Sequence, residues 1–223
     1  MDLTLPSGTR ATISRADDPS RGLVIIPDIW GLRPLFADMC GTLRDRTGWT
    51  VCSFEPFPGQ DLPGAADLGG LDARGSALLG LVDEDLVGDA VAAAEATGCE
   101  HVALIGFCMG GMYALTASAT GRFDRIASFY GMIHVPPHWA GPGHGDPVEA
   151  LAQRGPVEVM SIIGTADALT PPDHVLELEA AGVVVQRYQG ADHGFVHDAS
   201  RPAHRPEDAA DAWDRVLAFL AAT

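Results

Sequence analysis

The stretch Ile105-Gly106-Phe107-Cys108-Met109-Gly110-Gly111 stands where a short apolar run ends and a helical pattern begins. It fits the pattern Gly-x-nucleophile-x-Gly, with cysteine in the place of the more usual serine. A nucleophile in a sharp strand-to-helix turn needs neighbours without a Cβ atom, because bulk at Gly106 or Gly110 would clash across the turn. The positive end of the following helix favours a thiolate over a thiol. We therefore predict a strand–turn–helix unit that presents Cys108 as a nucleophile.

Similar apolar runs, bounded by glycine, proline and polar residues, recur on both sides of this unit and predict strands buried on both faces. They are Gly22–Pro27, Trp49–Phe54, His101–Gly106, Arg125–Tyr130, Val157–Gly164 and Val183–Tyr188. Helical patterns lie between or after them, at Leu35–Arg46, Asp85–Ala96, Met109–Ala119, Pro172–Ala181 and Pro206–Ala222. Strands that alternate with such helices predict an α/β fold with a mostly parallel sheet and helices on both faces.

We expect one domain over residues 1–223, because this length suits a single core and no repeat or domain-splitting linker is visible. Leu3–Leu5 and Arg10–Ser14 flank Pro-Ser-Gly and predict an antiparallel hairpin, within residues 1–15, at the edge of the sheet. The Pro- and Gly-rich segment His134–Gln153 predicts a long loop of functional or mobile character. Its three histidines, His134, His138 and His144, lack the short-range ligand pair of zinc sites, so we favour a solvated, lid-like loop.

The charge of the chain excludes several function classes. Its 14 basic and 30 acidic residues give a formal net charge of −16, which disfavours binding to nucleic acid. All the basic residues are arginines, so no lysine can form a Schiff base or complete a phosphate-binding Walker loop. We expect a small-molecule substrate, no nucleic-acid partner, and a monomer or small homo-oligomer.

Hydropathy and cysteine usage bear on location. The longest clean apolar run, Leu23–Ile26, is far shorter than the roughly 18 residues that cross a bilayer, and Met1–Arg15 lacks a signal-peptide pattern. The four cysteines, Cys40, Cys52, Cys99 and Cys108, form no C-x-x-C pair and are expected to be reduced. We therefore expect a cytoplasmic protein with no membrane partner.

A thiol nucleophile needs a base, and the base needs a group that orients it. Asp167 follows the predicted strand Val157–Gly164, and His193 follows the predicted strand Val183–Tyr188. Because the carboxyl ends of parallel strands share one edge of a sheet, we expect Cys108, Asp167 and His193 to meet there. Each also has a plainer interpretation: Cys108 as a small buried hydrophobe, Asp167 as the cap of the next helix, and His193 as a surface residue.

Five segments together resemble the dienelactone hydrolase family, a cysteine-dependent branch of the α/β-hydrolase superfamily. They are Val24–Gly31, Gly106–Gly111, Ser128–Gly131, Gly164–Asp167 and Ala191–Phe195, and the similarity extends from Gly22 to the C-terminal helix. The resemblance implies an α/β-hydrolase fold, Cys108 as nucleophile, His193 as base and Asp167 as its orienter. It also implies an oxyanion hole from the backbone N–H groups of Ile29 and Met109. Met109 fits independently, since the first amides of a helix lack partners.

Two departures from the family pattern concern the substrate and the thiol. Family members carry a glutamate that exchanges a hydrogen bond or proton with the thiol, whereas this chain has the shorter Asp28. We predict a thiol-modulating role for Asp28, with capping of the helix near Pro34 as the alternative. Members that act on dienelactone hold its carboxylate with two arginines. Arg74 matches the first, but His197 occupies the second position and the next arginine is Arg201, so another ester or lactone is an equally good candidate substrate.

Three aromatic residues complete the candidate substrate-binding set with Arg74 and His197. Trp30, Tyr130 and Phe195 are expected at strand or loop ends, where they either line an apolar acyl pocket or belong to the core. The spacing of His193 and His197 also suits a metal pair, but their neighbours indicate a loop, which disfavours that interpretation.

We predict hydrolysis of a carboxylic ester or enol lactone through an acyl-thioester on Cys108, without a metal or organic cofactor. One rival is a non-catalytic small-molecule receptor on the same fold, in which His193 lies well beyond hydrogen-bond reach of the Cys108 sulfur and no lid movement closes the distance. A second rival is a redox protein, which requires a resolving thiol near Cys108.

Overall fold

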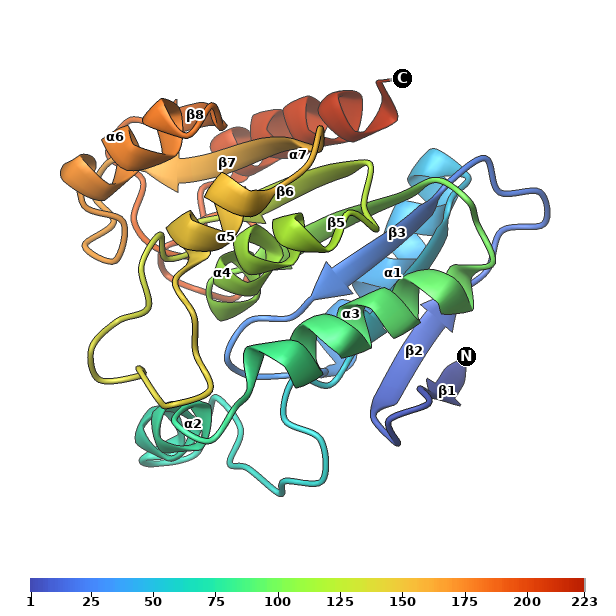
Figure 1. The fold of residues 1–223 in the computed structure, drawn as a ribbon, viewed down its shortest axis with the longest axis horizontal. Helices are drawn as coiled ribbons and strands as arrows, with labels where there is room; N and C mark the ends of the chain where they lie inside the picture. The colour runs from blue at the N-terminus through green and yellow to red at the C-terminus, as the bar shows by residue number, and fades with distance from the viewer. Residues whose placement is uncertain (223) are drawn as a thin grey trace.

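Eight strands form one sheet in the order β1-β2-β4-β3-β5-β6-β7-β8 (Figure 1). This computed structural model describes residues 1–222. The strands are β1 (Asp2–Thr4), β2 (Arg10–Ser14), β3 (Gly22–Ile26), β4 (Thr50–Phe54), β5 (Val102–Phe107), β6 (Arg125–Phe129), β7 (Glu158–Gly164) and β8 (Val184–Tyr188). Strands β3 to β8 pair in parallel, and β1 and β2 form an antiparallel hairpin at one edge. The mostly parallel sheet predicted from the sequence is confirmed.

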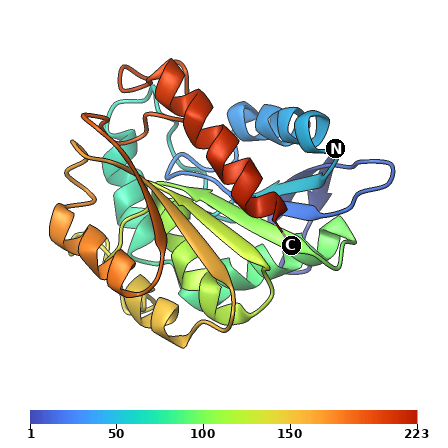
Figure 2. The same ribbon diagram turned by 90° about the horizontal axis from the view of Figure 1, so that it is seen from above.

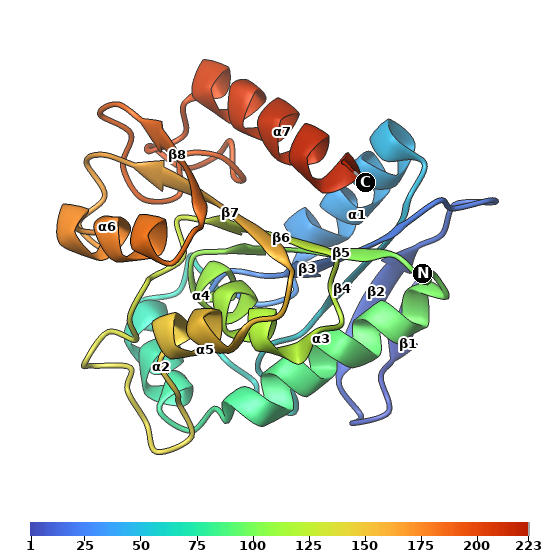
Figure 3. The same ribbon diagram turned by 45° about the horizontal axis from the view of Figure 1, so that its top comes forward.

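Helices cover both faces of this sheet. They are α1 (Pro34–Thr47), α2 (Gly70–Leu78), α3 (Asp83–Thr97), α4 (Met109–Thr116), α5 (Pro147–Gln153), α6 (Pro172–Ala180) and α7 (Pro206–Ala221), with a short 3₁₀ helix at Ala117–Thr120. Helices α1 and α7 lie on one face, whereas α3, α4 and α5 lie on the other, as the two turned views show (Figures 2 and 3). This layering explains why β3 and β5 are buried along their whole length.

The strand β8 departs from the prediction that every apolar run is buried on both faces. Its residues are largely half-buried or exposed, with Val184 44% exposed. The physical reason is its position: β8 pairs only with β7 and forms the edge of the sheet.

Two helices were not expected from the sequence. The inward positions of α2 are Gly70, Arg74 and Leu78, so only one large apolar residue marks its buried face. One apolar residue gives no helical periodicity in the sequence, so the pattern did not predict this helix. Helix α5 lies within the predicted loop His134–Gln153, and Asp146 caps it by accepting a hydrogen bond from the N–H of Val148 at 2.8 Å. The last 7 residues of the predicted loop are therefore helical.

Candidate active site

Cys108 occupies the turn between β5 and α4 in a strained backbone conformation, with φ 57° and ψ −118°. A non-glycine residue with positive φ costs roughly 1–3 kcal/mol and is held there by its surroundings. A Cβ atom at Gly106 would lie 1.9 Å from the carbonyl oxygen of Gly110, which confirms the predicted clash across the turn. A Cβ at Gly110 would instead lie 2.2 Å from the carbonyl oxygen of Ile26, at the end of β3. The two glycines thus set both the turn and the packing of α4 against β3.

Asp167 and His193 meet as predicted from their positions after β7 and β8. Nδ1 of His193 lies 2.8 Å from Oδ2 of Asp167, whose side chain is completely buried. The other carboxylate oxygen of Asp167 accepts the N–H of Leu169 at 2.8 Å. Helix α6 begins after Pro171 without any side-chain cap, so the alternative role of Asp167 as a helix cap is wrong. The carboxylate can only accept, so it keeps the proton of neutral His193 on Nδ1 and leaves Nε2 free to act as a base.

Nε2 of His193 is buried and has no partner within ordinary hydrogen-bond geometry among the described residues, but it lies close enough to Cys108 for a hydrogen bond with that side chain to contribute to the pKa of His193. Burial disfavours the charged imidazole, but the negative charge of a Cys108 thiolate and the contact with Asp167 together raise the pKa of His193 to about 10. A raised histidine pKa is the shift expected when an imidazolium lies beside a thiolate. The arrangement therefore brings together the three side chains that the sequence predicts as nucleophile, base and orienting carboxylate, with Nε2 of His193 beside Cys108.

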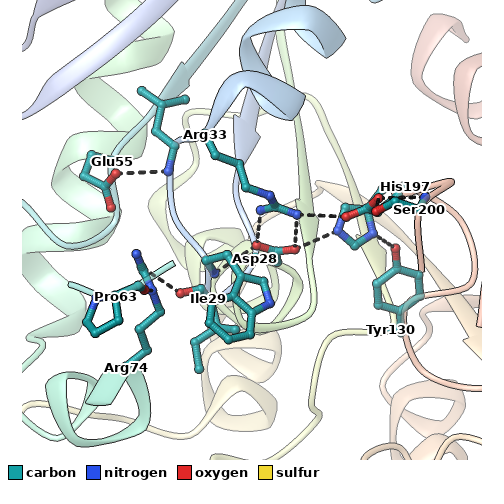
Figure 4. A network of polar contacts seen from close by, with 12 residues as sticks. Asp28, Ile29, Arg33, Glu55, Pro63, Arg74, Tyr130, His197 and Ser200 are labelled. Carbon is teal, nitrogen blue, oxygen red and sulfur yellow. Dashed lines mark hydrogen bonds and ion pairs between the residues drawn. The ribbon is translucent and has the colours of Figure 1, made fainter. Parts of the chain in front are cut away.

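The turn after β3 carries the candidate oxyanion donor Ile29 and is fixed at several points. The N–H of Gly31 donates to the carbonyl of Asp28 at 3.0 Å, and the N–H of Trp30 donates to the Asp28 carboxylate at 2.9 Å. Arg74 donates to the carbonyl oxygen of Ile29 at 3.0 Å (Figure 4). These bonds leave the N–H of Ile29 without a partner among the described residues, and Met109 opens α4 without a carbonyl to donate to.

Asp28 makes no hydrogen bond to Cys108, so no direct contact supports the thiol-modulating role predicted for it. Its carboxylate, 1% exposed, binds Arg33 through two hydrogen bonds of 2.6 and 3.0 Å and His197 through one of 2.8 Å (Figure 4). Burial alone would raise its pKa, but the bonds from His197 and Arg33 lower the pKa of Asp28 to about 2. The alternative role as a cap of α1 is wrong, since α1 has no side-chain cap.

His197 is an interior residue rather than a substrate contact. Its side chain is fully buried, Nε2 binds Asp28, and Nδ1 binds the hydroxyl of Tyr130. The imidazole stacks on the rings of Phe107 and Phe36, with centroids 4.8 and 5.9 Å apart. Burial is the main cause that lowers the pKa of His197, so the neutral form is favoured. Both ring nitrogens are engaged, so the prediction that His197 binds substrate is wrong for this structure.

Arg74 is also committed within the protein. Its guanidinium donates to the carbonyl oxygens of Pro63 at 2.7 Å, Ile29 at 3.0 Å and Leu62 at 3.3 Å, and the residue is 7% exposed. It also lies 5.8 Å from the ring centroid of Trp30. Three carbonyl contacts leave little of this guanidinium for a substrate carboxylate, which corrects the substrate-binding role predicted for Arg74.

The three candidate pocket aromatics separate into two groups. Tyr130 and Phe195 are fully buried core residues whose rings pack 5.8 Å apart, so neither presents a surface to a substrate. Trp30 remains partly exposed in the turn beside Ile29 and keeps its candidate role. Arg201 lies against the backbone next to His193, because a Cβ at Gly194 would approach its Nη1 to 2.3 Å.

The segment before α5 is attached to its neighbours. The N–H of Asp83 donates to the carbonyl of Gly143 at 3.0 Å, and the N–H of Gly145 donates to the Asp83 carboxylate at 2.7 Å. His134 contacts Asp146 at 2.8 Å and Glu177 at 3.1 Å. Within residues 1–222, no cluster of three or more His, Cys, Asp and Glu side chains has the arrangement of a metal site.

Two residues that the sequence did not single out shape this site. Arg33 pairs with Asp28, and Glu55 accepts the N–H of Leu32 at 3.0 Å and so fixes the end of the Ile29 turn. The only sequence signal for Arg33 was an opposite charge near Asp28 in the same turn. Glu55 directly follows β4, the neighbour of β3 in the sheet, so its position after a strand was the available signal.

Comparison with known proteins adds to this geometry. The model of a family described as "Dienelactone hydrolase family" matches residues 9–223. The chain belongs to the dienelactone hydrolase family. A "Putative carboxymethylenebutenolidase" of Synechocystis sp. is 36% identical over 123 residues, which are 52% of this chain and 48% of that protein. The aligned region thus spans about half of that relative.

A second relative aligns along nearly the whole of this dienelactone hydrolase family member. This "Putative carboxymethylenebutenolidase", of Saccharolobus solfataricus, is 25% identical over 95% of the chain and 93% of its own length. The crystal structure of a "Putative Dienelactone Hydrolase" from Klebsiella pneumoniae subsp. pneumoniae superposes with a TM-score of 0.84 at 21% identity, covering 100% of this chain and 98% of that one. The expected α/β-hydrolase-like fold is confirmed, and the family member is a dienelactone hydrolase-like hydrolase. None of the helices in residues 1–222 has the length and apolar character needed to cross a membrane.

Proposed function

We propose that this protein hydrolyses a carboxylic ester or enol lactone through an acyl-thioester on Cys108. The single observation that carries the proposal is the 2.8 Å contact between Asp167 and Nδ1 of His193, which directs the unoccupied Nε2 toward the nucleophile turn. The names of two relatives, carboxymethylenebutenolidase and a probable 2-oxo-3-(5-oxofuran-2-ylidene)propanoate lactonase, support a lactone or ester as the substrate class.

In the first half of the proposed reaction, His193 holds the proton of Cys108 and the thiolate attacks the carbonyl carbon. The N–H groups of Ile29 and Met109 stabilise the oxyanion, where loss of one such donor costs about 3 kcal/mol of transition-state stabilisation. Collapse breaks the ester C–O bond, and the imidazolium returns its proton to the leaving alkoxide or enolate. The acyl group is then bonded to the sulfur of Cys108.

In the second half, Nε2 of His193 removes a proton from water, and the resulting hydroxide attacks the thioester carbonyl. The C–S bond breaks, the thiolate of Cys108 is restored beside the imidazolium, and the carboxylic acid leaves. Asp167 accepts the hydrogen of Nδ1 throughout and holds the ring in position. A cytoplasmic location belongs to the same proposal, and the four free cysteines are compatible with a reducing compartment.

Burst-phase hydrolysis of p-nitrophenyl acetate, combined with iodoacetamide labelling mapped to each cysteine, tests this function. Wild type and the matched control Cys99→Ala are expected to show a burst close to one equivalent, whereas Cys108→Ala is expected to show none. His193→Ala should slow both the burst and the labelling of Cys108. Hydrolysis that persists in Cys108→Ala would disprove the proposal. Binding of an ester without turnover, with labelling spread over the other cysteines, would favour the receptor hypothesis.

A further inference from the structure

A buried chain of hydrogen bonds connects the turn of the oxyanion hole with the ring that packs on the catalytic base. The Asp28 carboxylate accepts the N–H of Trp30 at one end and binds His197 at the other, and His197 in turn binds the hydroxyl of Tyr130 (Figure 4). Asp28, His197 and Tyr130 are at most 6% exposed. This group of three, which we call the buried relay, has no role in the reaction steps described above.

Proton positions along the relay follow from the chemistry of its members. Asp28 is ionised, so it only accepts, and Nε2 of His197 must carry the hydrogen that it donates. A neutral His197 then presents a lone pair on Nδ1, and the hydroxyl of Tyr130 must donate to it. The single proton of Tyr130 is therefore directed away from the substrate. Tyr130 cannot serve as an oxyanion donor or general acid while this bond is kept.

The aromatic ring of Tyr130 contacts the catalytic base directly. The rings of Tyr130 and His193 pack edge to face, with centroids 5.2 Å apart and an angle of 66° between their planes. Tyr130 also has φ 41°, and Cys108 is the only other non-glycine residue with positive φ in the described chain. The two strained residues directly follow the neighbouring strands β5 and β6, and the N–H of Cys108 donates at 3.0 Å to the carbonyl of Phe129, which precedes Tyr130. Observed strain of this kind clusters at functional sites.

We infer that Tyr130 is a positioning residue for His193, and that Asp28 and His197 fix the Tyr130 side chain for this task. The hydroxyl bond removes the rotational freedom of the Tyr130 ring, and the ring then limits the freedom of the imidazole opposite Cys108. The same carboxylate holds the N–H of Trp30, so the oxyanion turn and the base are set by one buried group. Arg33, bound to both oxygens of Asp28, keeps that group charged and in place.

The inference rests on the proposed function, and the test compares Tyr130→Phe with Tyr113→Phe. Tyr113 is also fully buried, and its hydroxyl lies 3.0 Å from Nε2 of the half-buried His144, so both variants lose a tyrosine–histidine hydrogen bond. Tyr130→Phe is expected to lower the rate of acylation by p-nitrophenyl acetate about tenfold, as expected for loss of one hydrogen bond, with KM unchanged. Iodoacetamide alkylation of Cys108 should slow in parallel. Tyr113→Phe should leave both rates unchanged.

A second pair of variants tests the role of His197. In His197→Gln the amide nitrogen can donate to Asp28 and the amide oxygen can accept from Tyr130, whereas His197→Leu can do neither. We expect acylation within about threefold of wild type for His197→Gln and a loss of about tenfold or more for His197→Leu. Near-normal acylation in His197→Gln, but not in His197→Leu, would indicate a positioning role. Thermal unfolding of all four variants measures any general loss of stability.

Three outcomes would overturn the inference. Unchanged acylation and alkylation rates in Tyr130→Phe would show that the hydroxyl does not position the base. A rise in KM with unchanged kcat would make Tyr130 a substrate contact, and an equal loss of rate in Tyr113→Phe would indicate destabilisation alone. Cys108→Ala distinguishes this failure from failure of the proposed function: if Cys108→Ala retains activity, the nucleophile assignment fails as well.

Discussion

The carboxylate of Asp167 and Nδ1 of His193 lie 2.8 Å apart, although 26 residues separate them in the chain. The contact fixes which nitrogen of the imidazole carries the proton and which faces the nucleophile. The charge state of His193 also depends on Cys108, because the negative charge of a Cys108 thiolate is the largest of the influences that favour the imidazolium.

Replacement of Cys108 by alanine should therefore lower the pKa of His193. In the wild type that pKa is raised to about 10, and the imidazolium loses its nearest anion in Cys108→Ala while burial continues to oppose the charge. NMR titration of the ring C–H signals of His193 measures both values. Cys52→Ala, which removes a buried thiol from β4, is the control and should leave the titration unchanged. A titration of His193 that is identical in Cys108→Ala would contradict the thiolate–imidazolium pair.

Substitution of Gly110 by alanine should disrupt the oxyanion hole. The added Cβ would lie 2.2 Å from the carbonyl oxygen of Ile26 and 2.3 Å from that of Pro27, both backbone atoms at the end of β3. We expect a loss of about 2–3 kcal/mol in the free energy of unfolding, together with a fall in kcat. Gly88→Ala on the exposed side of α3, where a Cβ meets nothing within 4 Å, is expected to stabilise the protein by about 0.5–1 kcal/mol. Urea unfolding of both variants measures the two free energies of unfolding. Equal free energies for Gly110→Ala and Gly88→Ala would contradict the prediction.

Replacement of Arg74 by methionine should affect all substrates alike. Arg74 holds three backbone carbonyl oxygens, one of them that of Ile29, so its loss is expected to destabilise the protein by about 2–4 kcal/mol and to lower kcat. Because these contacts are internal, the factor should be equal for a neutral ester and for one with a carboxylate. Kinetics with such a matched ester pair is the measurement. A selective rise in KM for the anionic ester would instead make Arg74 a substrate clamp.

The stability contributed by His134 should depend on pH. Burial opposes its charged form, but the hydrogen bonds and charges of Asp146 and Glu177 prevail and raise the pKa of His134 in the folded protein. Its stabilisation is therefore fully present below the unfolded pKa of about 6.5 and disappears as pH rises through the higher folded value. We expect wild type to exceed His134→Gln in melting temperature most at pH 5.5–6 and least at alkaline pH. His138→Gln is the control, because the ring of His138 packs on Trp139. A difference that grows with pH would contradict this sign.

Local sequence signals determined most of the architecture and predicted which three side chains, Cys108, Asp167 and His193, come together at one edge of the sheet. The alternation of apolar runs and helical patterns predicted the parallel sheet, because such strands must be buried between helices. Gly106 and Gly110 predicted the turn at Cys108; the clash at Gly106 involves Gly110 within the turn, whereas the clash at Gly110 involves Ile26 at the end of β3 and needed the tertiary structure to be seen. The positions of Asp167 and His193 after two strands predicted their meeting, since the ends of parallel strands share one edge of the sheet.

The roles of Asp28, Arg74 and His197 were decided only by the tertiary structure. Their positions in motifs predicted that Asp28 modulates the thiol and that Arg74 and His197 bind substrate. In the structure, each side chain is hydrogen-bonded to a group distant in the chain: Asp28 and His197 bind one another, and Arg74 binds the carbonyl oxygen of Ile29. A buried charge must be paired and hydrogen-bonded, and its partners are whichever groups packing brings near. A sequence motif predicts on which turn or strand end such a residue lies, but the packing of the whole fold decides which groups its side chain binds.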